Sequence, residues 1–296
     1  MATSLIEHAS QRIDVTAGFT SEPEGARATV WLGRAARWWA VLAVTSQLLM
    51  AVYVTDFYGA RALAGRIAAW NQGMPRGYIP GASFGNAVVA SHLIGTVAFM
   101  VMGAMQLLPG LRRRAPRVHR WSGRVYLLVA AVLAIGGLYL VWVRGGVGGF
   151  WQHVGLSCDA LAILACGTMA LRTARARDIA AHRRWALRLW IAGNAVWFFR
   201  LALFLVLMIF RRPVGFDPAT FDGPLLIALT FAQSMVPLLV LEGYFAAQRT
   251  RRVAARWAMT TVLGVAMLFT VAGTAAVALI AWVPRMHRAI EEKPPT

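Results

Sequence analysis

Residues 119–143 read HRWSGRVYLLVAAVLAIGGLYLVWV, and this stretch decides the fold. After Arg124, no charged side chain follows until Arg144. The apolar core of a lipid bilayer is about 30 Å thick, and an α-helix crosses it in roughly 20 apolar residues. Lipid offers no hydrogen-bond partners to an unpaired backbone, so such a segment must be helical. The stretch therefore predicts one helix that crosses a membrane.

Six further segments share this apolar character. The whole chain is 58% hydrophobic and 14% charged, whereas soluble domains carry about 25% charged residues. We therefore expect an all-α polytopic membrane protein in contact with the lipid bilayer. A loose cytoplasmic tail over 1–30 should precede a single transmembrane domain over 31–296. The seven predicted helices are 38–55, 87–108, 119–143, 150–171, 182–210, 223–247 and 258–283.

The basic residues predict how the chain is oriented. Nineteen arginines between Arg27 and Arg256 fall in the tail and in every second connection, whereas nine basic residues between Arg61 and Lys293 fall in the others. Because positively charged loops stay in the cytoplasm, the N-terminus is expected inside and the C-terminus outside. Topology also accounts for the net charge of +18, so we expect no nucleic acid partner. The arginine clusters could also attract acidic lipids or an anionic reductant.

Four of the six histidines lie near the ends of predicted helices and recur at a similar spacing. His92 and His153 lie toward the outer face, whereas His119 and His182 open their helices at the cytoplasmic face. The first histidine of each half precedes the second by 27 and 29 residues. The strings HRWSGR at 119–124 and HRRWALR at 182–188 also echo each other. Residues 87–210 therefore look like two copies of one hairpin that form a four-helix core.

A duplicated core would place His92 opposite His153 and His119 opposite His182. Two imidazoles that face each other across a helical bundle can be the axial ligands of a haem iron. We predict one or two haem b groups on these four histidines, with one site near each face and Arg200 as a candidate partner for a propionate. Glycines on the same helices either admit the flat ring or serve ordinary helix packing. They are Gly95, Gly103, Gly136, Gly137, Gly155, Gly167 and Gly193.

This layout of helices and histidines resembles the di-haem b-type cytochromes of the ascorbate- and quinone-linked transmembrane class. The resemblance covers about residues 87–210. It implies electron transfer across the membrane from a quinone or a small anionic reductant to an outer acceptor.

Several strings carry a more specific similarity over most of 87–205. They are His92, Gly103, QLLP at 106–109, HRWSGRVY at 119–126, DIAAHRRW at 178–185 and Arg200. In these strings the chain is similar to a bacterial family of predicted membrane proteins, the domain-of-unknown-function 2306 family. This similarity implies a location in the bacterial inner membrane and supplies no activity.

Two charged residues, Asp159 and Arg200, lie inside apolar segments at similar predicted depths. A charge inside the membrane is costly, so it is expected to be paired or functional. An Asp159–Arg200 ion pair is one interpretation, which we favour because both partners are present. The other is that Arg200 holds a haem propionate or the anionic group of a substrate.

The long connection over 56–86 should hold a short interfacial helix followed by turns, either as a lid over an outer site or as a plain link. The two cysteines, Cys158 and Cys166, are about 12 Å apart by helix rise, so they cannot form a disulfide. No hydrolase or phosphate-binding motif indicates an enzyme class.

Two functions from different classes remain. The leading hypothesis is transmembrane electron transfer by a haem b protein. The alternative is a non-redox membrane protein, a transporter or a structural subunit, whose polar cavity is lined by the same histidines.

Overall fold

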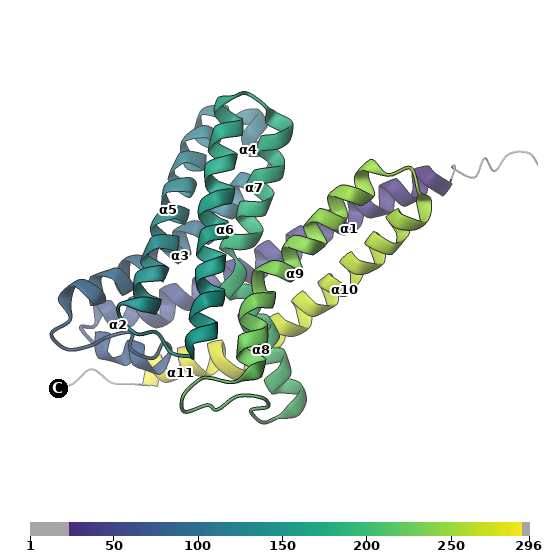
Figure 1. The fold of residues 1–296 in the computed structure, drawn as a ribbon. Helices are drawn as coiled ribbons and strands as arrows, with labels where there is room; N and C mark the ends of the chain where they lie inside the picture. Colours follow the sequence, from purple (N-terminus) through teal and green to yellow (C-terminus); the bar gives the residue numbers. More distant parts are fainter. Residues whose placement is uncertain (1–23, 292–296) are drawn as a thin grey trace, which may run out of the picture.

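The computed structural model describes residues 24–291, which are almost entirely helical (Figure 1). The long helices are α1 (Glu24–Val54), α3 (Ser83–Leu107), α5 (Pro116–Trp142), α6 (Phe150–Arg175), α9 (Pro224–Arg249) and α10 (Val253–Val277). Short elements prolong or connect them: η1 (Thr55–Gly59), α2 (Ala60–Leu63), η2 (Ile67–Gln72), α4 (Pro109–Arg114), α7 (Ile179–Gly193), α8 (Ala195–Phe210), η3 (Ala278–Trp282) and α11 (Val283–Glu291).

Six helices within the described range are long and apolar enough to cross a membrane. The pair α7 and α8 passes the same test as one span with a 46° bend, which gives the seventh. Large apolar side chains such as Leu128, Ile135 and Leu268 are more than 60% exposed, as lipid-facing residues must be. The prediction of an all-α polytopic membrane protein is confirmed.

Helix α1 begins at Glu24, inside the segment predicted to be a loose tail. The residues from 24 to 30 are helical because they pack against α10: Ala28 is fully buried, and the Arg256 guanidinium donates to the carbonyl oxygen of Gly25 and the hydroxyl of Thr29. The tail prediction is therefore wrong for these seven residues. Residues 1–23 of the predicted tail lie outside the described range.

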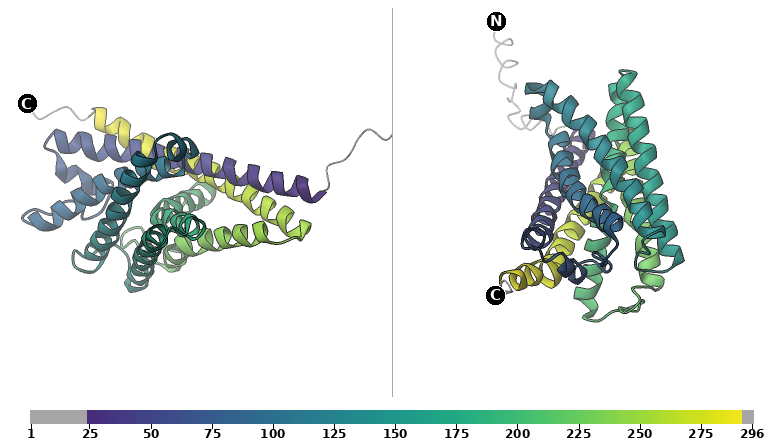
Figure 2. Two further views of the ribbon diagram at one scale, coloured as in Figure 1. Left: turned by 90° about the horizontal axis from the view of Figure 1, so that it is seen from above. Right: turned by 90° about the vertical axis from the view of Figure 1, so that its left-hand side faces the viewer.

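The helices form two groups that diverge toward one end of the molecule (Figures 1 and 2). In one group, α3, α5, α6 and α7 run side by side and enclose Phe99, Tyr126, Cys166 and Leu189. In the other, α1 packs against α10 and against the lower part of the first group. A four-helix core is thus present, but it ends at Gly193 and not at residue 210, because α8 packs against α9 and α10 instead.

In both hairpins of this core, the second helix carries its histidine at the same position after the helix start. Pro116 is the first residue of α5, and the Asp178 side chain caps α7 by accepting from the Ala181 amide at 2.9 Å. His119 and His182 are each the fourth residue of their helix. Their amides donate to the residue before the helix, at 3.1 and 2.9 Å. The local equivalence suggested by the sequence therefore holds at the histidines.

The connection over 56–86 is held by hydrogen bonds to the loop between α5 and α6. The helix of α1 continues to Leu63, a 3-10 turn follows over Ile67–Gln72, and the rest is turns. Arg144, beyond the end of α5, donates to the carbonyl oxygens of Arg76 and Gly77 and to the Asn86 side chain. These bonds join two loops that are distant in sequence.

Candidate functional site

The inner histidines are brought together. His119 of α5 and His182 of α7 lie within electrostatic range of each other, both partly buried, at the end of the core where the two hairpins turn. Arg112 and Arg120 are within the same range of His119. Two imidazoles from different hairpins therefore meet in a cationic environment at one end of the bundle.

The contacts of these two rings determine which ring nitrogen atoms are available to bind a metal. Nδ1 of His182 lies 2.9 Å from the Ala170 carbonyl oxygen of α6. A carbonyl only accepts, so Nδ1 carries the proton and Nε2 keeps its lone pair. Nδ1 of His119 is buried without a hydrogen-bond partner among the described residues. A backbone bond to Nδ1 is how proteins orient a histidine whose Nε2 binds a metal.

The outer histidines occupy different surroundings. The His92 ring lies beside Gly137 of α5 and within electrostatic range of Arg200. The His153 ring instead packs edge-on against Trp142, with ring centroids 5.5 Å apart. Gly137 and Trp142 are about 7.5 Å apart along α5 by helix rise. We find no contact between His92 and His153 within the described part of the chain, so the structure supplies no paired ligands near the outer face.

The glycines that could have admitted a flat ring are used for helix packing. A Cβ atom on Gly103 would meet Trp190 and Tyr126, one on Gly193 would meet Phe99, and one on Gly155 would meet Thr230. A Cβ atom on Gly95 would lie 3.0 Å from Leu133, whereas one on Gly136, Gly137 or Gly167 would make ordinary van der Waals contacts with neighbouring side chains. Of the two interpretations, small-residue packing is the one that the contacts support.

The favoured Asp159–Arg200 ion pair is wrong. Asp159 of α6 is 6% exposed, its side chain lies beside Ser234 of α9, and its Oδ1 has no hydrogen-bond partner among the described residues. Arg200 of α8 instead points toward α1, where its guanidinium contacts the Met50 sulfur at 3.9 Å. The two residues are at similar depths but face different helices, which helix rise alone cannot reveal.

The ion pair that does join two helices was not predicted. The Arg188 guanidinium of α7 donates two hydrogen bonds, of 2.6 and 2.9 Å, to the Glu242 carboxylate of α9. Arg188 also lies over the Trp185 ring, 4.6 Å from its centroid. The sequence signal was a lone acid on one helix at the same depth as an arginine on another.

The break between α7 and α8 is a further feature that sequence reasoning missed. Asn194 separates the helices, and its Nδ2 donates to the Trp190 carbonyl oxygen at 2.7 Å, while its Oδ1 is buried without a partner in the described range. The buried amide groups of Gln47 and Gln233 also have unpaired atoms. Several polar groups inside the membrane therefore lack protein partners.

Within the described residues, no group of three or more His, Cys, Asp or Glu side chains is placed to hold a bare metal ion. Both cysteines are free, as predicted. A two-histidine haem site falls outside that criterion, because the porphyrin supplies the other iron ligands.

Residues 89–219 match the model of a family described as Predicted membrane protein (DUF2306), which confirms the similarity seen in the sequence. The matched range runs from α3 to the loop after α8 and includes all four candidate histidines and Arg200. No curated protein and no solved structure matches the chain.

Proposed function

We propose that this DUF2306 membrane protein binds one haem b between His119 and His182 and transfers electrons near the cytoplasmic face of the bacterial inner membrane. The observation that supports the proposal is that the imidazoles of α5 and α7 lie within electrostatic range of each other, with His119 Nδ1 unpaired among the described residues and His182 oriented through Nδ1 by the Ala170 carbonyl. His92 and His153 have different neighbours, so the proposal comprises one haem, whereas the sequence suggested one or two.

The residues of the inner site suit such a group. The Ala170 carbonyl fixes the proton on Nδ1 of His182, which leaves Nε2 to face the iron. Arg112 and Arg120 could pair with the two propionates, because guanidinium groups bind carboxylates through two hydrogen bonds. When bound, the haem would supply a one-electron carrier. The same arginines favour a small anionic reductant as the donor on this side, with a quinone as the other candidate donor.

An absorption spectrum tests the proposal. Protein purified from haem-replete cells should give a reduced-minus-oxidised b-type signal with one haem per chain. His119→Ala and His182→Ala should each lose the signal, because either change removes one axial ligand. His153→Ala and the exposed His287→Ala are matched controls and should keep it. A colourless parent protein, or a signal that survives both inner substitutions, would refute haem binding here.

A non-redox function has its own observation. His92, Arg200 and the break at Asn194 place polar groups in the membrane without carboxylate partners in the described range. Broken membrane helices with unpaired polar groups commonly line substrate paths in transporters. A colourless protein would leave this function as the better supported one, and it predicts that Arg200→Gln alters uptake of an anionic solute.

A further inference from the structure

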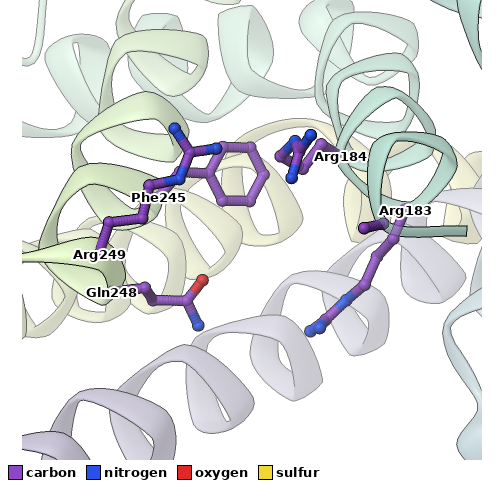
Figure 3. A pocket seen from close by; sticks show the side chains of 6 residues that line it. Arg183, Arg184, Phe245, Gln248 and Arg249 are labelled. Carbon is purple, nitrogen blue, oxygen red and sulfur yellow. The ribbon is translucent and has the colours of Figure 1, made fainter. Parts of the chain in front are cut away.

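We infer that a pocket between α7 and α9 binds the phosphate group of an anionic ligand at the cytoplasmic face. The pocket has a volume of about 170 Å³ and is lined by Ala180, Arg183, Arg184, Phe245, Gln248 and Arg249. Figure 3 shows the arginines of α7 on one side and Gln248 and Arg249 of α9 on the other, with Phe245 between them. Nothing in this inference depends on haem.

The charge of the pocket is entirely positive. Three of its six lining residues are arginines, and none is acidic. Arg183, Arg184 and Arg249 make no ion pair or hydrogen bond with another described residue. Three cations held around one small cavity repel one another, so an anion between them would relieve that repulsion.

The acid on the α9 side of the pocket, Glu242, is already paired. Glu242 lies on α9 about one turn further into the membrane than Phe245, and both of its oxygens accept from Arg188. The Arg188 guanidinium also lies 5.4 Å from the centroid of the Phe245 ring. Phe245 lines the pocket, whereas Arg188 and Glu242 do not, so the three lining arginines are left to bind a ligand from outside.

The size and chemistry favour a phosphate. Sites for drug-sized ligands have volumes of about 300–1,000 Å³, so this pocket suits one small group. Guanidinium groups bind phosphate through paired hydrogen bonds, and the Gln248 amide can donate another. The phosphate could belong to an acidic phospholipid headgroup or to a soluble phosphate, because basic pockets between membrane helices accept both.

Thermal unfolding of the full chain in a zwitterionic detergent separates these sources. Phosphatidylglycerol should raise the unfolding temperature by several degrees relative to phosphatidylcholine. The variant Arg184→Gln with Arg249→Gln should lose most of this shift. Arg113→Gln with Arg114→Gln removes the same charge from exposed positions of α4 and should keep it. If millimolar inorganic phosphate produces an equal shift, the ligand is a soluble phosphate; if it does not, the ligand is the lipid.

Native mass spectrometry provides a second readout if the double variant unfolds. The single variants Arg184→Gln and Arg249→Gln should each retain fewer phosphatidylglycerol molecules than the parent, and Arg184→Lys should partly restore them. The inference is overturned if neither probe stabilises the parent, or if the pocket variants and the α4 control respond alike.

Discussion

The Asp159 carboxyl group is a single buried group that lowers the stability of the fold. It is almost fully buried in α6 beside Ser234, and its Oδ1 has no hydrogen-bond partner among the described residues. An unpaired acid in an apolar environment destabilises the folded state. Asp159→Asn keeps the shape and removes the charge, so it should raise the free energy of unfolding by about 1–2 kcal/mol. Denaturation of the purified protein would measure this.

Asp178→Asn is the matched control for that substitution. Asp178 is exposed and caps α7, a position where asparagine is equally effective, so stability should change by less than about 0.5 kcal/mol. If Asp159→Asn lowers stability, the carboxylate has a partner that binds it in the membrane, and the unpaired interpretation fails.

At the scale of one element, the bend between α7 and α8 arises from a side chain and needs no proline. Nδ2 of Asn194 donates to the Trp190 carbonyl oxygen, to which the Asn194 backbone amide would donate in a straight helix. That backbone amide donates to the Ile191 carbonyl oxygen instead. Asparagine side chains compete with the backbone in this way. Asn194→Ala should therefore straighten the span.

Pulsed electron resonance between spin labels tests this. Labels on Ile179→Cys and Ile209→Cys, in a chain with Cys158→Ser and Cys166→Ser, mark exposed ends of the bent span. Removing a 46° bend should lengthen their separation by about 4 Å, from helix rise. Asn194→Ser retains a short donor and should stay bent. Equal distances in Asn194→Ala and the parent would show that neighbouring helices impose the bend.

For the whole molecule, the arginine distribution predicts a topology that labelling can check. Arg113→Cys lies on the arginine-rich side, and Ala219→Cys lies in the loop between α8 and α9. In intact cells, a membrane-impermeant maleimide should label the second cysteine and spare the first, because basic loops remain in the cytoplasm. Both should react once the membrane is opened. The reverse pattern would invert the orientation and move the inner histidines to the outer face.

The sequence predicted the fold well because lipid imposes one simple rule. Apolar length alone located the seven spans, and the start signals at Pro116 and Asp178 located the helices that carry the inner histidines. Side-chain direction is different, because it depends on how helices rotate against each other. That rotation brought His119 and His182 together, separated Asp159 from Arg200, and paired Arg188 with Glu242.

The length of the first helix has a consequence for the bilayer itself. From Glu24 to Leu63 the helix contains 40 residues, about 60 Å at 1.5 Å per residue, although its uncharged middle between Arg37 and Asp56 measures only about 27 Å. Both charged ends must therefore emerge into water. A stretch this short matches a thin hydrocarbon layer, so lipids with longer acyl chains would create hydrophobic mismatch. Acyl-chain length is thus a variable to which this protein should respond.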